Sequence, residues 1–330
     1  MFLPAAGFAC TPVSDSIQRK IRMTRVRPCR QFARYVALPL LAWAGMVPSL
    51  PAGESPVLAA GATLQRLAGE YRFTEGPTAD HAGNVYFTDQ PNDRILRWNA
   101  ADGAVEDWLT PAGRANGLFL TAGGELIAAA DQHNQLWSIA PDRSVRVLLK
   151  GHGGKLLNGP NDIWVSGRGD IYFTDPLYPR DYWSRDPRMQ QSGQHVYMLA
   201  AGAVEASPML TDLEQPNGII GSLDGQTLYV SDIGAGRTYA YDIGADGVPR
   251  NKRLFCELGS DGMTADNEGN VYLTGKGVTV FDRAGKQIEH IDVPQDWTAN
   301  VTFGDSGHDL LFITASTAIY GIRMRVRGKL

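Results

Sequence analysis

Six side chains that end in a carboxylate or a carboxamide recur at one position of a repeated sequence pattern. They stand in the strings FTEGP, RANGL, NGPND, QPNGI, SDGMT and TANVT. In chain order they are Glu75, Asn116, Asn161, Asn217, Asp261 and Asn300. Each stands seven or eight residues before a glycine that opens a run rich in β-branched and aromatic residues. Because this position offers oxygen in every copy and neither thiolate nor imidazole, it suits a hard divalent cation such as calcium.

The glycine-initiated runs are the elements that must position these side chains. Their first residues are Gly83, Gly124, Gly169, Gly225, Gly269 and Gly307. The first run reads GNVYFTD, which is typical of a turn followed by a β-strand. The glycines lie 38 to 56 residues apart, about the length of one four-stranded propeller blade. We therefore predict an all-β fold, a six-bladed β-propeller with four-stranded blades, whose equivalent residues converge on the central axis.

The two ends of the propeller are predicted to meet. The chain ends soon after the third strand of the sixth blade, expected at residues 318–324, so that this blade lacks an outer strand. Residues 64–67 (LQRL) precede the first blade and belong to none. We expect this N-terminal strand to complete the sixth blade, because closing the ring removes the open edges at which sheets aggregate.

Residues 1–52 differ from the rest of the chain. They hold seven Lys/Arg residues and one acid, followed by an apolar run at residues 35–50. This order is typical of a secretory signal, and the run is short for a membrane span. We predict a signal peptide or N-terminal leader at 1–52 and a propeller domain at 53–330. The chain is then exported, to the periplasm, without a stable membrane span in its mature form. An uncleaved N-terminal anchor is the alternative.

Composition excludes several other classes. A net charge of −4 provides no basic surplus for nucleic-acid binding. The six histidines show no HExxH spacing, and no GxSxG string is present, which argues against a zinc site or a serine-hydrolase elbow. Cys256 is the one cysteine outside the leader, and we expect a buried structural thiol there. We expect a monomer or a small homo-oligomer.

Over residues 64–324 the chain resembles the senescence-marker-protein/gluconolactonase family. The resemblance rests on the strings FTEGPTADHAGNVYFTD, NGPNDIWV, QPNGIIGSLDG and SDGMTADNEGNVYLTG. It implies a six-bladed propeller with one divalent metal ion in the central channel, usually Ca²⁺, with Zn²⁺, Mg²⁺ or Mn²⁺ as alternatives. It also implies a hydrolase that acts on the carboxylic ester bond of a sugar lactone. The family's metal-binding residues match Glu75, Asn161, Asn217 and Asp261.

Lactone opening needs a polarised carbonyl and an activated water molecule. The resemblance implies Asp261 as the catalytic base, although binding a metal weakens a carboxylate as a base. Asp162 is the second candidate, and the alternative for it is a structural role in its turn. The expected substrate-binding residues, which would contact hydroxyls of the sugar lactone, are Asn116, Asn161, Asn300 and Arg114.

Two other functions stay open at this point. One is a phosphotriesterase of the diisopropyl-fluorophosphatase type that uses the same metal and channel. The other is a non-catalytic binding propeller in which calcium plugs the axis. The second repeat lacks the Arg-x-Asn-Asp-Gly string of the animal members, so the resemblance does not define the sugar. An insertion at residues 178–194 is expected over one mouth of the channel, where it either shapes the substrate pocket or is surface decoration.

Overall fold

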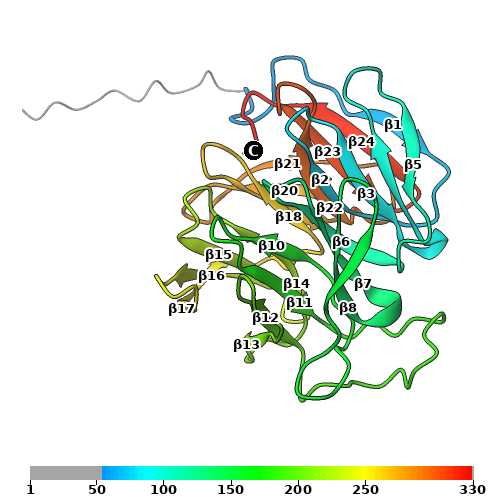
Figure 1. The fold of residues 1–330 in the computed structure, drawn as a ribbon. Coiled ribbons are helices and arrows are strands. Elements are labelled where there is room, and N and C mark those ends of the chain that lie inside the picture. The colour runs from blue at the N-terminus through cyan, green and yellow to red at the C-terminus, as the bar shows by residue number, and fades with distance from the viewer. Residues whose placement is uncertain (1–53, 329–330) are drawn as a thin grey trace, which may run out of the picture. The chain divides into compact units, whose positions relative to one another are not determined.

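The computed structural model describes residues 54–328, and these form six four-stranded antiparallel sheets (Figure 1). The predicted six-bladed β-propeller is therefore confirmed. The predicted leader at residues 1–52 lies outside the described residues. Within 54–328, no helix has the length and apolar character needed to cross a membrane.

Each of the first five blades uses four consecutive strands, so that chain order is also spatial order from the axis outward. Blade one consists of β2 (Thr74–Ala79), β3 (Val85–Asp89), β4 (Arg94–Trp98) and β5 (Val105–Leu109). Blade two consists of β6 (Ala115–Leu120), β7 (Leu126–Ala130), β8 (Gln135–Ile139) and β9 (Val145–Leu149). Blade three consists of β10 (Ile163–Val165), β11 (Ile171–Asp175), β12 (His195–Leu199) and β13 (Ser207–Leu210).

The other blades repeat this arrangement. Blade four consists of β14 (Pro216–Gly221), β15 (Thr227–Asp232), β16 (Arg237–Ile243) and β17 (Pro249–Cys256). Blade five consists of β18 (Met263–Ala265), β19 (Val271–Gly275), β20 (Gly277–Phe281) and β21 (Gln287–Ile291). Blade six consists of β22 (Asn300–Gly304), β23 (Leu310–Ala315), β24 (Ala318–Arg323) and β1 (Gln65–Gly69). Two short 3₁₀ turns follow β3 and β7, η1 (Gln90–Asn92) and η2 (Asp131–His133).

The sixth blade closes the ring in the predicted way. Its strand order is β1-β24-β23-β22, with β1 antiparallel to β24. The strand runs from Gln65 to Gly69, slightly later than the predicted residues 64–67. The segment before it also follows β24, because the backbone N–H of Arg325 donates to the carbonyl of Val57 at 2.9 Å. The N-terminal part of the propeller thus covers what would otherwise be an open sheet edge.

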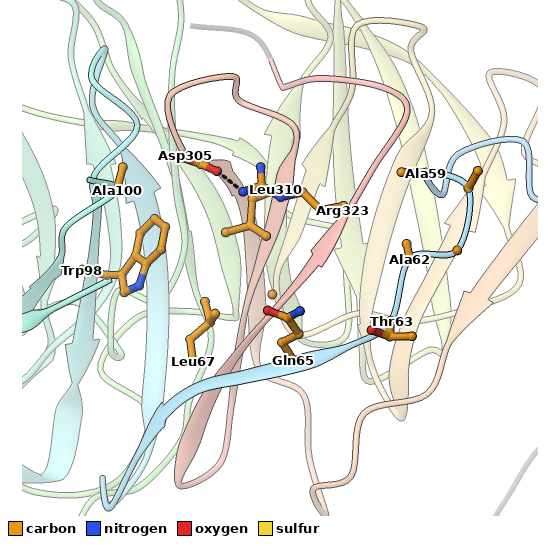
Figure 2. A pocket seen from close by; sticks show the side chains of 13 residues that line it. Ala59, Ala62, Thr63, Gln65, Leu67, Trp98, Ala100, Asp305, Leu310 and Arg323 are labelled. Atoms are coloured by element: carbon orange, nitrogen blue, oxygen red, sulfur yellow. Dashed lines mark ion pairs between the residues drawn. The ribbon is translucent and has the colours of Figure 1, made fainter. Parts of the chain in front are cut away.

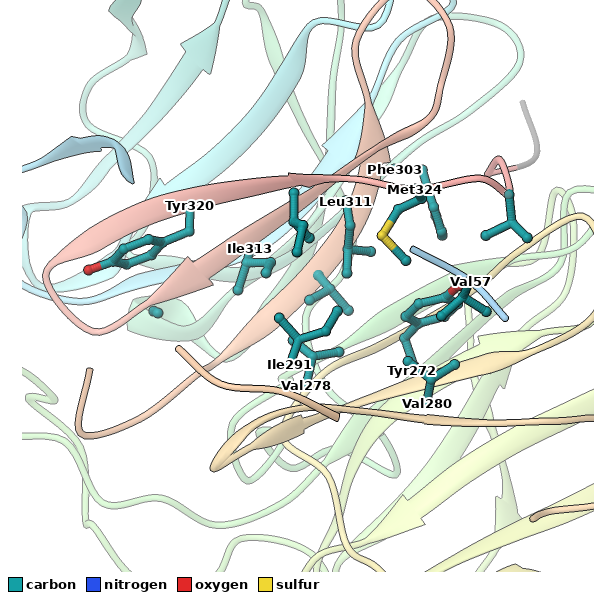
Figure 3. Close-up of a cluster of buried hydrophobic side chains, with 14 of the residues drawn as sticks. Val57, Tyr272, Val278, Val280, Ile291, Phe303, Leu311, Ile313, Tyr320 and Met324 are labelled. Carbon is teal, nitrogen blue, oxygen red and sulfur yellow. The ribbon is translucent and has the colours of Figure 1, made fainter. Parts of the chain in front are cut away.

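Apolar side chains fill the spaces between neighbouring blades. Between blades five and six, Val57 lies beside Tyr272 and Val280 and is fully buried (Figure 3). The closing segment therefore adds a core side chain as well as a strand. Cys256 is buried with its thiol free, as predicted, and burial raises its pKa to about 11.

The six innermost strands contact one another in a closed cycle, β2, β6, β10, β14, β18, β22 and back to β2. Residues that occupy equivalent places at the beginning of these strands therefore surround one axis. This ring of strands positions the site described next.

Candidate metal and substrate site

All six axial residues stand at or just before the beginning of an inner strand. Glu75, Asn116 and Asn217 are the second residues of β2, β6 and β14, and Asn300 is the first of β22. Asn161 and Asp261 each precede their strand, β10 and β18, by two residues. Five of the six side chains are buried, and Asp261 keeps some exposure to solvent.

Close approach between neighbouring inner strands brings these residues together. The backbone N–H of Gly117, in blade two, donates to the carbonyl of Asn161, in blade three, at 2.8 Å. A Cβ atom on Gly262 would lie 2.0 Å from Cγ of Asn300. Gly117 in RANGL and Gly262 in SDGMT must therefore be glycines. The axial residue of the next blade, Asn161 or Asn300, already occupies the space that a side chain at either position would need.

Glu75, Asn217 and Asp261 form the centre of the site. Nδ2 of Asn217 donates to Oδ1 of Asp261 at 2.8 Å. Burial, followed by the nearby charge of Asp261, raises the pKa of Glu75 well above its usual range. Burial also raises the pKa of Asp261 to about 6, against the opposing effect of hydrogen bonds from Trp297 and Asn217. The negative charge of Asp261 thus acts on a buried Glu75, which is costly unless a cation or a proton compensates it.

The oxygen atoms of this group fit a hard cation. Oδ1 of Asn217 is buried and has no hydrogen-bond partner, and the side chain as a whole is 1% exposed. A buried amide oxygen without a donor is uncommon and points to an unseen partner. Within residues 54–328 no group of three or more His, Cys, Asp or Glu side chains is arranged to hold a metal ion, so a metal site at this place would need amide oxygens as well as carboxylates. Glu75, Asn161, Asn217 and Asp261 supply that combination.

Asp162 has backbone partners in two blades. Its Oδ1 accepts the N–H of Ile163 at 3.0 Å, and its Oδ2 accepts the N–H of Ile219, in blade four, at 3.2 Å. Burial raises its pKa to about 7. Together with Asn300 it lines a cavity of about 1010 Å³ that Glu75 and Asp261 do not line. Asp162 and Asn300 thus border the opposite mouth of the channel.

Arg114 lies against the insertion and not against the axial side chains. Its guanidinium donates to the carbonyl of Pro91 and stacks over the ring of Tyr182, with 4.6 Å from Cζ to the ring centroid. Its backbone N–H donates to Asp93 at 2.7 Å. These contacts make Arg114 a support for the loop that carries Tyr182.

Two aromatic residues that the sequence did not single out for the site contact its centre. Nε1 of Trp297 donates to Oδ2 of Asp261 at 2.6 Å, and the hydroxyl of Tyr178 accepts from Nδ2 of Asn217 at 3.0 Å. Trp297 precedes β22 and Tyr178 follows β11, both in irregular connections. Neither belongs to the repeated run, so the repeat gave no signal for them.

Three aspartates hold the segments that lead into the site. They end the second strand of blades one, three and four, as Asp89, Asp175 and Asp232. Each carboxylate accepts the backbone N–H groups two and three residues before the axial residue of its own blade. The donors are Arg72 and Phe73 at 3.0 and 3.2 Å, Asn158 and Gly159 at 2.9 and 2.8 Å, and Glu214 and Gln215 at 2.9 and 2.9 Å. The last residue of the FTD and VSD strings therefore positions Glu75, Asn161 and Asn217.

The insertion between β11 and β12 is anchored on blade two. Asp131 accepts hydrogen bonds from Nε of Arg180 at 3.1 Å and from the hydroxyl of Tyr182. Its carbonyl accepts Nε1 of Trp183 at 3.0 Å. Because Tyr178 of the same loop contacts Asn217, the insertion borders the site, and surface decoration does not describe it.

The groove in Figure 2 lies elsewhere on the molecule. It has a volume of about 510 Å³ and is lined by Gln65 and Leu67 of β1, Trp98 of β4 and Arg323 of β24. None of the axial residues lines it. It separates the outer parts of blades six and one and is no part of the candidate site.

A family model described as "SMP-30/Gluconolactonase/LRE-like region" matches residues 73–317. The chain belongs to this family. The match covers all six axial residues, Tyr178 and Trp297, and it begins after the closing strand β1. The predicted family resemblance is thereby confirmed.

Known members of the SMP-30/gluconolactonase family cover most of this chain. A gluconolactonase of Zymomonas mobilis is 26% identical over 82% of this chain and 84% of its own length. A regucalcin of Xenopus laevis is 24% identical over 74% of this chain and 84% of its own length. The solved gluconolactonase of Xanthomonas campestris has a TM-score of 0.74, with 29% identity over 82% of this chain and 95% of that one.

Proposed function

We propose that this family member hydrolyses a sugar lactone at the axial site. The observation that carries the proposal is the buried, unpaired Oδ1 of Asn217 beside the carboxyl groups of Asp261 and Glu75. Membership of the SMP-30/gluconolactonase family and similarity to two gluconolactonases support the reaction class. The centre of the site also contacts the insertion through Tyr178, which gives a substrate a polar wall.

We also propose that Glu75, Asn161, Asn217 and Asp261 hold one divalent cation. Their oxygen atoms favour Ca²⁺, and similarity to a regucalcin is in keeping with calcium. The bound ion would supply Lewis-acid polarisation of the lactone carbonyl. Two carboxylates would balance its charge, and the amide oxygens of the two asparagines would complete the protein's share of the ligands.

The side chains themselves would orient the reactants and move the proton. Asp261 is held at both oxygens, by Asn217 and Trp297, so its orientation is defined before a substrate arrives. As general base it would take a proton from the attacking water while the new C–O bond forms. The ring C–O bond then breaks, and the proton passes to the departing alkoxide, which leaves a hydroxy acid.

Other polar residues have supporting parts in this scheme. Asp162 is the second candidate for the base, with its carboxylate fixed by two backbone donors. Asn116 and Asn161 would contact hydroxyls of the sugar lactone, and Asn300 would contact them from the side of the cavity that it lines together with Asp162. Arg114 would act through the insertion, which it supports at Tyr182.

The proposal is tested by removing and restoring metal. Residues 53–330 would be treated with a chelator and assayed for gluconolactone opening above the uncatalysed rate, with Ca²⁺, Zn²⁺, Mg²⁺ or Mn²⁺ added back. We expect activity to be lost and then restored, best by Ca²⁺. Unchanged rates after complete stripping would contradict the metal site. Hydrolysis of an organophosphate without any lactone would favour a phosphotriesterase, and binding of calcium without turnover would favour a non-catalytic propeller.

Export to the periplasm is a separate proposal. It is supported by the basic segment and the short apolar run within residues 1–52. N-terminal sequencing of the protein recovered from a periplasmic extract tests it. The expected result is a new terminus near residue 53, and retention of the full chain in the cytoplasm would contradict it.

A further inference from the structure

The insertion brings one arginine close to the axial site. The guanidinium of Arg180 lies over the ring of Tyr178, and the hydroxyl of Tyr178 accepts a hydrogen bond from Nδ2 of the axial residue Asn217 at 3.0 Å. Arg180 therefore brings a positive charge to the edge of the axial site.

The guanidinium of Arg180 is held in place from one side. Its Nε donates to Oδ2 of Asp131 at 3.1 Å, and its Cζ lies 5.6 Å from the centroid of the Tyr178 ring. Asp131 is itself fixed, because it also accepts hydrogen bonds from Tyr182 and Gln90. The position of the guanidinium is thus set by a buried carboxylate and an aromatic ring before any ligand binds.

The other side of the guanidinium remains available. Within the described part of the chain its two terminal nitrogens make no hydrogen bond, and the side chain is 26% exposed. Planar N–H donors of this kind match the two oxygens of a carboxylate, phosphate or sulfonate. Among residues 54–328 the ion pair that Arg180 makes is with Asp131, through Nε.

We propose that Arg180 is a specificity-determining residue that selects lactones carrying an anionic substituent. The inference rests on the proposed lactone hydrolysis and adds the class of substrate. The lactone ring would lie at the axial oxygen atoms, and its anionic group would face the terminal nitrogens of Arg180. A neutral sugar lactone would leave these donors to water and gain less from binding.

The insertion provides a matched control in Arg185. Its Nε donates to Asn134 at 2.9 Å, and its terminal nitrogens donate to the carbonyls of Asn158, Asp186 and Arg188. The guanidinium also stacks on Trp183, with 3.7 Å from Cζ to the ring centroid. Arg185 thus uses its donors within the protein, and replacing it should alter stability without altering the preference for charge.

The experiment compares kcat/KM for a neutral and an anionic sugar lactone, such as gluconolactone and 6-phosphogluconolactone, in the calcium-loaded protein. We expect the wild type to favour the anionic lactone. Arg180→Gln should lower kcat/KM for the anionic lactone by about 10- to 100-fold, mainly by raising KM. The value for the neutral lactone should change by less than about threefold. Arg180→Lys should keep part of the preference for the anionic over the neutral lactone, and Arg185→Gln should keep that preference in full.

Two results would overturn the inference. One is a wild type without preference for the anionic lactone. The other is an Arg180→Gln variant that loses both substrates equally while its melting temperature is unchanged. If neither lactone is opened by the wild type, the proposed function itself fails, and that outcome is distinct from both.

Discussion

The two carboxyl groups at the axis have unequal surroundings. Glu75 accepts one hydrogen bond, from the N–H of Gly76 at 3.1 Å, and is 3% exposed. Asp261 accepts two from side chains and keeps contact with solvent. Burial therefore favours the neutral form of Glu75 and raises its pKa, while the donors Asn217 and Trp297 favour the ionised form of Asp261. A substitution at Glu75 should therefore show the effect of a bound cation on this site most clearly.

Glu75→Gln should separate metal binding from stability. The change preserves shape and removes one negative charge, so we expect calcium affinity to fall by more than about 100-fold. The metal-free variant should unfold at the same temperature as wild type or higher, because a poorly compensated buried acid is gone. Calorimetric calcium titration and thermal unfolding with and without calcium measure both effects. Undiminished calcium binding would show that Glu75 is not a ligand.

Trp297→Phe should weaken the site through Asp261. The substitution keeps an aromatic ring and removes the Nε1–H that donates to Oδ2. We expect calcium affinity to fall about 10- to 100-fold, as is usual when a partner of a metal-binding side chain is lost. Trp183→Phe is a suitable comparison, since that indole donates to the carbonyl of Asp131 within the insertion. Equal calcium affinity in Trp297→Phe and wild type would contradict the assignment.

At the residue scale, the register of the repeat assigned Glu75, Asn217 and Asp261 to one position, and in the structure Asn217 is hydrogen-bonded to Asp261. The roles expected for these residues stay predictions. Tyr178 and Trp297 could not be found in this way, because they lie in connections whose course depends on packing. The two hydrogen bonds that Asp162 accepts from backbone N–H groups were equally hidden, since one of the donors belongs to the next blade.

At the scale of elements, the last residue of the second strand of a blade holds the segment that leads into the first, innermost strand. An aspartate at the end of β3, β11 or β15 accepts backbone N–H groups of the segment that enters the inner strand. The same short sequence string therefore builds the sheet and orients the axial residue. Blade five has Gly275 at this place, and there Ser260 instead donates its N–H to Oγ of Ser231 in the neighbouring blade at 2.5 Å.

Asp232→Asn tests this arrangement. The amide can accept from only one of the N–H groups of Glu214 and Gln215, so we expect a loss of about 1–3 kcal/mol in unfolding free energy. Because these residues precede Asn217, calcium affinity should also fall about 10-fold. Asp224→Asn, in the turn at the other end of β15, is the control and should change stability by less than about 0.5 kcal/mol. Denaturant unfolding and calcium titration provide the values, and identical behaviour of the two variants would refute the positioning role.

The closing strand is the second element with a measurable role. A protein that begins at Glu70 lacks β1 and the buried Val57, and it exposes the edge of β24. We expect its melting temperature to fall by roughly 10 °C, equivalent to a few kcal/mol, and aggregation to increase. A protein that begins at Glu54 is the control. Equal melting temperatures and equal solubility would show that ring closure contributes little.

At the scale of the whole molecule, the sequence predicted the closed ring of blades, but it did not predict which residues border each mouth of the central channel. Six repeats and a spare N-terminal strand are enough to predict a closed propeller. The repeat places the axial residues at the beginning of the inner strands, but it does not show which irregular connections cover that end, because their course depends on packing. Tyr178 of the insertion and Trp297 contact the site, whereas Asp162 and Asn300 border the cavity at the other mouth.

A substrate should therefore enter from the mouth bordered by the insertion. Thr264 of β18 is partly exposed and lines the opposite cavity, which Asp261 does not line, so Thr264→Trp would narrow that mouth. We expect kcat/KM for the lactone to stay within about threefold of wild type, because neither reactant passes the new side chain. Thr264→Val controls for the lost hydroxyl, and thermal unfolding shows whether the indole is accommodated. A rise in KM of about 10-fold or more in a stably folded Thr264→Trp, absent in Thr264→Val, would mean that the substrate uses the opposite mouth.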